Sequence, residues 1–130
     1  MGEEVVDGGD GFRISARQVD PDILLVAVAG DLDVLTVAQT TTFLTRTAES
    51  APRHLILDLS EVTFLTSSGI GLLIAVSENG TYGRLHLLGV LDNRSVQRPL
   101  ASVALLGLFD IAPDLDTLLA RLRTSEPVSD

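Results

Sequence analysis

Apolar residues in the first half of the chain follow two different spacings. Every second residue is apolar from residue 12 to 16, which predicts a half-buried strand, and the unbroken apolar run at 23–29 predicts a buried one. The Asp-Pro-Asp sequence at 20–22 favours a turn, so the two strands are predicted to form a hairpin. From residue 34 to 48 the apolar positions recur every three or four residues, which predicts a helix with Asp31 or Asp33 as its N-cap.

The middle of the chain predicts a buried strand followed by a buried helix. Residues 54–59 are largely apolar and predict the strand, with a short connection at 61–66. The apolar block at 70–76 is too continuous for a helix that faces water on one side. Serine is a favoured N-cap, so Ser67 or Ser68 is expected to start this helix. It should end near the Asn-Gly pair 79–80, where glycine can adopt the left-handed conformation.

The remaining elements continue an alternation of strands and helices. Strands are predicted at 84–88 and 109–111. The helix predicted at 93–106 contains Pro99, which should kink it or delay its start. Its inner face is expected to carry Val96, Leu100 and Val103. A last helix begins at the Pro-Asp pair 113–114 and shows an apolar stripe of Leu115, Leu118, Leu119 and Leu122.

These elements form one domain. A hairpin followed by alternating strands and helices predicts an α/β domain with a mixed sheet, which we place at residues 12–123. The acidic, Gly-rich residues 1–11 are predicted to be a flexible lead-in, and residues 124–130 a polar tail.

Charge and composition narrow the possible functions. Nine basic residues against 18 acidic ones give a net charge of −9, which argues against nucleic-acid binding because that requires clustered Lys and Arg. The longest apolar runs fall far short of the roughly 20 residues that span a bilayer. No secretory signal begins the chain, and the absence of cysteine excludes a disulfide framework. These features predict a cytoplasmic protein that does not insert into a membrane.

The residues give little support to catalysis or metal binding. A serine hydrolase requires Gly-x-Ser-x-Gly at its nucleophile, whereas residues 65–69 read Leu-Thr-Ser-Ser-Gly. The only histidines, His54 and His86, fall inside predicted strands and are expected to be structural rather than a base or metal ligands. We therefore expect no enzymatic activity, no cofactor and no metal.

One stretch of the sequence resembles a known family. Residues 58–73, DLSEVTFLTSSGIGLL, are similar to the signature of STAS domains, and specifically of the anti-sigma factor antagonists of bacteria. Gly-Asp-Leu-Asp at 30–33, Gly-Arg-Leu at 83–85 and Leu-Gly-Leu-Phe at 106–109 resemble further elements of the family, in the same order. The resemblance covers about residues 12–122 and implies the STAS fold. That fold is an α/β architecture with a single mixed sheet of about five strands and about four helices packed mainly on one face.

The resemblance also implies a function and the residues that carry it. The phosphorylated serine of the family precedes a glycine at a helix start, and Ser68 matches it. Such an antagonist binds an anti-sigma factor and so releases a sigma factor. The anti-sigma factor, an ATP-dependent serine kinase, phosphorylates the serine and ends the binding, and a serine phosphatase restores it. The implied partner-binding residues are Gly30, Asp31, Asp33, Thr66, Ser67, Ser68, Gly69 and Ile70.

The residues leave other interpretations open. The family usually has aspartate where this chain has Thr66, which keeps a hydroxyl, lacks the charge and is interpreted as a plain loop residue. Ser68 could be only a helix cap. Thr66 and Ser67 are possible phosphate acceptors if the register of the partner has shifted. Asp31 and Asp33 could be caps as well as partner contacts. The alternative functions are an unphosphorylated STAS adaptor in a stress-signalling or lipid-transport complex, and a domain that binds a nucleotide or another small ligand at 67–69. Both a monomer and a weak homodimer fit the sequence.

Overall fold

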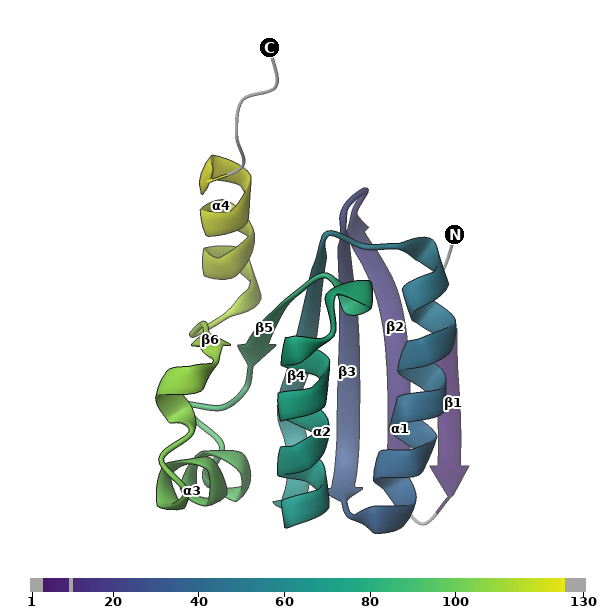
Figure 1. Ribbon diagram of the computed structural model, residues 1–130, viewed down its shortest axis with the longest axis vertical. Helices are drawn as coiled ribbons and strands as arrows, with labels where there is room; N and C mark the ends of the chain where they lie inside the picture. The colour runs from purple at the N-terminus through teal and green to yellow at the C-terminus, as the bar shows by residue number, and fades with distance from the viewer. Residues whose placement is uncertain (1–3, 10, 126–130) are drawn as a thin grey trace.

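The structure, a computed structural model, describes residues 4–9 and 11–125 and contains one six-stranded sheet in the order β1-β2-β3-β4-β5-β6 (Figure 1). Strands β1, β2 and β3 pair antiparallel, and β3, β4, β5 and β6 pair parallel. The predicted α/β fold with a mixed sheet is therefore confirmed, with six strands where about five were expected. The strands are β1 (Glu4–Gly9), β2 (Phe12–Asp20), β3 (Ile23–Leu32), β4 (His54–Leu65), β5 (Arg84–Leu88) and β6 (Asp110–Ile111).

Four helices cover the two faces of the sheet unequally. Along β3, Leu24, Val26 and Val28 point to the face that packs with α1 and α2 in a large apolar cluster. The alternate residues Ile23 and Leu25 point to the opposite face and join a smaller cluster with leucines of α4. The buried residues of α3 belong to the large cluster, so three helices share one face, as predicted. The helices are α1 (Val34–Thr47), α2 (Ser67–Glu78), α3 (Arg94–Ser102) and α4 (Leu115–Ser125).

The prediction of a flexible lead-in was wrong for residues 4–9, which form β1. This strand pairs with β2 along the edge of the hairpin, with Val6 opposite Ile14 and packed against the large cluster. Glu4 forms an ion pair with Arg46 of α1 at 3.4 Å. An edge strand exposes one face and one unpaired side to water, so acidic residues and glycine are compatible with a strand at this place. The other lead-in residues, 1–3 and 10, lie outside the described residues, apart from the turn residue Gly11.

Strand β4 is longer than the sequence predicted. Instead of ending at residue 59 and leading into a loop, it continues to Leu65 alongside the end of β3. Two irregularities in register allow this extension, which pairs Gly30 with Val62 and Leu32 with Leu65. Val62, Leu65 and Leu32 are all buried. The buried residues Leu59, Val62 and Leu65 are spaced three apart, while Phe64 is exposed, so burial along this extension does not alternate as in a simple strand.

Helix α3 is shorter than predicted. It is capped by Asn93, includes Pro99 and ends at Ser102, and a 3₁₀ turn follows at Leu106–Leu108. Val103 therefore falls outside the helix and is half exposed, whereas it was expected on the inner face. The next residue, Ala104, has a positive φ of 60°, a conformation that does not continue a helix. Strand β6 likewise has two residues rather than three.

Two further helix ends differ from the prediction. Helix α2 ends at Glu78 as expected, but its C-cap is Asn79 with φ −98°, so a left-handed glycine does not end it. Helix α4 extends to Ser125, so the first two residues of the predicted polar tail are helical, and residues 126–130 lie outside the described residues. No helix in the described part of the chain is both long and apolar enough to cross a membrane.

The close approach of β5 to β4 predicts that Gly89→Ala destabilises the fold. Gly89 has φ +73°, and an added Cβ would overlap the backbone nitrogen of Ser60. Strain of this kind costs of order 1–3 kcal/mol or more. Gly71→Ala is the matched control, because Gly71 lies in α2 and a Cβ there meets nothing within 4 Å. Chemical denaturation should show a large loss of unfolding free energy for Gly89→Ala and a gain of about 0.5–1 kcal/mol for Gly71→Ala. Equal effects of the two substitutions would show that Gly89 is not required for the close approach.

Candidate functional site

Two helix N-termini lie side by side at one edge of the sheet. Strands β3 and β4 are parallel and end together, with Leu32 paired to Leu65. Helices α1 and α2 begin immediately afterwards, and both start at the lower end of the sheet in Figure 1. Because each helix N-terminus carries a partial positive charge, this edge favours negatively charged groups. We refer to it as the helix-start edge, formed by residues 30–36 and 63–70.

The first helix start has the predicted aspartate cap. The Asp33 carboxylate accepts a hydrogen bond from the Thr36 backbone N–H at 3.0 Å, and the Thr36 hydroxyl accepts one from the Asp33 N–H at 2.9 Å. This capping box lowers the pKa of Asp33, chiefly through the Thr36 backbone N–H. Asp31 is not the cap: its carboxylate accepts a hydrogen bond from the Thr63 hydroxyl at 2.6 Å. Of the two carboxylates, only that of Asp33 has a role in the helix.

The second helix start is capped by Thr66, and the prediction that Ser67 or Ser68 caps it was wrong. The Thr66 hydroxyl donates a hydrogen bond to the Leu32 carbonyl at 2.8 Å and accepts one from the Gly69 N–H at 3.4 Å. The Thr66 backbone N–H also donates to the Leu32 carbonyl, at 3.1 Å. Thr66 is therefore not a plain loop residue, because it joins the start of α2 to the end of β3. Threonine is itself a favoured N-cap, so three successive hydroxyl residues left the choice open in the sequence.

Gly69 allows the start of α2 to approach the end of β3. It is buried, and an added Cβ would lie 3.1 Å from both the Cβ and the carbonyl oxygen of Leu32. The same Cβ would lie 2.5 Å from a side-chain carbon of Leu65. A side chain larger than hydrogen would force Leu65 and Leu32 to shift. The role of Gly69 in this structure is thus close packing, not direct exposure to a partner.

Ser67 and Ser68 occupy the first turn of α2 with their hydroxyls uncommitted. Ser67 is exposed and Ser68 is half-buried. Neither hydroxyl has a hydrogen-bond partner among residues 4–9 and 11–125, in contrast to Thr66. A hydroxyl at this place can accept a phosphoryl group, and the helix N-terminus would favour the resulting charge.

Exposed apolar side chains surround the two helix starts. Val34, Leu35 and Phe64 are 74%, 67% and 57% exposed, respectively. Ile70, which was expected to supply contact area, is half-buried and packs against the large cluster. A cavity of about 550 Å³ lies beside them, and its lining includes Gly30, Asp31, Asp33, Leu35, Glu61 and Thr63. The edge therefore combines apolar side chains with carboxylates. Leu35 and Phe64 were not predicted as site residues, because the apolar pattern does not show which apolar residues remain exposed.

The two histidines lie away from this edge. His54 and His86 are buried between the sheet and α4, 8% and 1% exposed. Among the described residues, no three His, Asp or Glu side chains converge in a way that could hold a metal ion. The helix-start edge itself contains no histidine, so the described residues place no general base of that kind beside the serines.

The sequence and the fold are both similar to those of known proteins. The family model described as STAS domain matches residues 15–118. An anti-sigma factor antagonist from Mycobacterium paratuberculosis is 24% identical with a TM-score of 0.75, over 91% of this chain and 99% of that one. The Bacillus cell-fate determinant SpoIIAA in its phosphorylated form is 19% identical with a TM-score of 0.61, over 83% and 97%. RsbS from Moorella thermoacetica is 23% identical with a TM-score of 0.65, over 84% and 93%. No curated protein sequence matches the chain.

The double role of Thr66 predicts that Thr66→Val destabilises the protein by about 1–2 kcal/mol, the usual cost of a lost N-cap. Valine keeps the shape but neither donates to the Leu32 carbonyl nor accepts from the Gly69 N–H. Thr66→Ser should retain most of the stability because it retains the hydroxyl. Ser67→Ala is the control and should change the unfolding free energy by less than about 0.5 kcal/mol. Chemical denaturation measures the unfolding free energy of each variant. A larger loss of unfolding free energy from Ser67→Ala than from Thr66→Val would refute the assignment of Thr66 as the cap.

Proposed function

The chain belongs to the STAS domain family, and from this premise we propose that it is an anti-sigma factor antagonist of the cytoplasm. In its unphosphorylated form it binds an anti-sigma factor, which is an ATP-dependent serine kinase, and a sigma factor is released. Phosphorylation of Ser68 by that kinase ends the binding, and a serine phosphatase restores it. The protein itself catalyses no reaction in this cycle.

The observation that carries this proposal is the state of the three successive hydroxyls at the start of α2. The Thr66 hydroxyl is committed to the Leu32 carbonyl, which leaves the hydroxyls of Ser67 and Ser68 as acceptors. Ser68 matches the serine that precedes a glycine in the family signature. Gly69 keeps the backbone of this turn against β3, so the position of Ser68 is fixed by packing. A kinase would therefore meet Ser68 at a defined place on the surface.

Electrostatics explain how one phosphate would switch binding without unfolding the protein. The phosphate would add a charge of about −1.5 to −2 at the second residue of α2, where the helix N-terminus favours it. At an interface the same charge would have to be desolvated and would repel any partner carboxylate nearby, so binding would be lost. A coupling of a few kcal/mol changes affinity by a hundredfold or more. The partner surface should therefore offer apolar contacts to Leu35 and Phe64.

The departure of this chain from the family pattern at Thr66 is compatible with the proposal. Aspartate and threonine are both favoured N-caps, so Thr66 can supply the cap that an aspartate at the same place would supply. What the threonine removes is one negative charge near Ser68. The unphosphorylated adaptor remains the second candidate, because loss of that charge could alter recognition by the kinase.

We expect one phosphate, an added mass of about 80 Da, on Ser68 after incubation of the full chain with a cognate anti-sigma kinase and ATP. Peptide mass spectrometry locates it, and isothermal titration should show binding lost by at least about a hundredfold. Ser68→Ala should bind but take up no phosphate, whereas the matched control Ser67→Ala should still be modified. Phosphate found only on Ser67 would show that the phosphorylation site is Ser67 and not Ser68. Unchanged binding in the presence of ATP, with no phosphate added, would favour the adaptor.

The exposed apolar residues of the helix-start edge give a second test of the same proposal. Leu35→Ser and Phe64→Ser should each weaken binding to the anti-sigma factor by roughly tenfold or more, the effect of losing a buried apolar contact at an interface. Both side chains are exposed, so stability should change little. Leu108→Ser is the matched control, because Leu108 is 56% exposed and lines a cavity with Ser77 near the other end of α2. A stronger effect from Leu108→Ser would place the interface elsewhere.

A further inference from the structure

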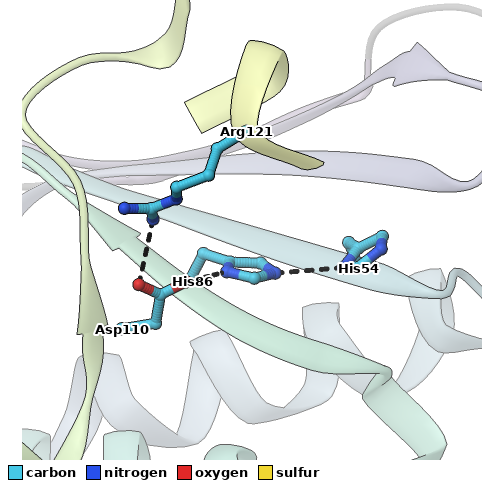
Figure 2. Close-up of polar contacts among 4 residues, drawn as sticks. All are labelled: His54, His86, Asp110 and Arg121. Carbon is cyan, nitrogen blue, oxygen red and sulfur yellow. Dashed lines mark hydrogen bonds and ion pairs between the residues drawn. The ribbon is translucent and has the colours of Figure 1, made fainter. Parts of the chain in front are cut away.

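Both histidines of the chain belong to one polar network that runs from the sheet to α4, which we call the histidine network (His54, His86, Asp110 and Arg121; Figure 2). His54 Nδ1 lies 3.0 Å from His86 Nε2, and His86 Nδ1 lies 2.5 Å from Asp110 Oδ2. The Arg121 guanidinium donates to Asp110 Oδ1 at 3.0 Å. Four elements, β4, β5, β6 and α4, are thereby joined through side chains.

The histidine network is embedded in the smaller apolar cluster. In the parallel register His86 lies opposite Ile56 on one side and Asp110 on the other. His54 is two residues before Ile56, so it points to the same face of the sheet, the one covered by α4. Ile56, Leu118 and other apolar residues of that cluster fill the space around them. Buried imidazoles in such surroundings need hydrogen-bond partners, and each ring provides one for the other.

The chemistry of the groups fixes where the protons are. A carboxylate can only accept, so His86 Nδ1 carries a proton and donates it to Asp110. In the neutral ring His86 Nε2 is then an acceptor, and His54 Nδ1 donates to it. One additional proton can be accommodated, because His86 Nε2 can become the donor if His54 Nδ1 becomes the acceptor. Two additional protons cannot, because N–H groups of two cations would then face each other across 3.0 Å.

We propose that His54 and His86 form a proton-binding site that holds the C-terminal turn of α4 against the sheet and releases it when both rings are protonated. A cavity of about 240 Å³ lies beside His54 and gives the ring room to move, and its walls include Leu122 and Arg123 of α4. A charged His54 that turns away from His86 enters this space and displaces the last turn of the helix. The device lies away from the helix-start edge and is independent of Ser68.

The charged groups around the two rings determine the direction of the response. Asp110 favours a proton on His86, whereas Arg84 of the same strand disfavours it. Asp20 and Asp22 line the cavity beside His54 and attract a charged ring toward it, while Arg123 opposes them. The last turn of α4 is itself tied down by the pair of Arg123 and Asp20 at 2.8 Å. Entry of a cationic ring would compete directly for that aspartate.

Burial lowers the pKa of His86, and the hydrogen bond to Asp110 opposes this only in part. The unfolded chain, with an ordinary pKa of about 6.5, therefore binds protons that the folded chain does not. Stability from this group is complete above about pH 6.5 and is lost as the pH falls through the lower pKa of the folded state. Acidification, not alkalinisation, is thus the direction that opens the network.

The proposal is tested on the unmodified full chain by NMR titration of the histidine rings together with hydrogen exchange of the α4 amides. Protonation of one ring should change the chemical shifts of the other, because the two rings share one hydrogen bond. Exchange at the end of α4, corrected for its intrinsic pH dependence, should rise about tenfold or more between roughly pH 7.5 and pH 5. Ring chemical shifts that respond to pH independently of each other, or protection of α4 that does not change with pH, would overturn the proposal.

Two variants distinguish the release of α4 by histidine protonation from a destabilisation of α4 that does not depend on pH. His54→Gln should reduce the pH dependence of α4 exchange, because a glutamine amide can accept from or donate to His86 but cannot become a second cation beside it. Arg123→Gln is the matched control, since it removes the pair with Asp20 and leaves both histidines. It should raise exchange of α4 at every pH and retain the pH dependence. If His54→Gln keeps the dependence of the parent chain, the histidine pair is not the proton-binding site.

Discussion

The hydrogen bonds between Thr66 and the carbonyl of Leu32 hold the helix-start edge together. They join the start of α2 to the end of β3, across the parallel pairing of Leu32 with Leu65. Gly69 favours this close approach, because a Cβ at this position would lie 3.1 Å from Leu32 and would force a shift. Once the two strands end together, α1 and α2 must begin side by side. The alignment of both helix N-termini, and the place of every group near them, depends on this junction.

The three neighbouring hydroxyls at this junction have different roles. A helix start needs one cap, and Thr66 supplies it, so the hydroxyls of Ser67 and Ser68 are not required for folding. A modification of Ser68 can then change the surface without removing a structural contact. Asp33 serves the neighbouring helix in the same way, through its capping box with Thr36. The opposite face of the sheet holds a separate polar assembly, in which His54 and His86 link strand and helix under α4.

The apolar pattern predicted most of the fold, and its errors have identifiable causes. Strands at 12–17, 23–29 and 84–88 and the leucine stripe of α4 were visible because each buries a regular set of positions. Strand β1 was missed because an edge strand next to a hairpin can be acidic and Gly-rich. The extension of β4 was missed because two irregularities in register replace its alternation. Val103 was misplaced because α3 ends before it, next to a residue with positive φ.

For the site, the amino-acid types alone establish which chemical groups are present: three successive hydroxyls before a glycine, two aspartates at a neighbouring helix start, and two histidines in strands. Local preferences could not choose among Thr66, Ser67 and Ser68 as the cap, since both residue types favour that role. The choice of cap depends on long-range packing, because the carbonyl of Leu32 comes from a strand 34 positions earlier and, of these three hydroxyls, bonds that of Thr66. The contact between His54 and His86 likewise depends on the parallel register of β4 and β5. Residue identity fixes what each group can donate or accept, while long-range packing fixes which partner it meets.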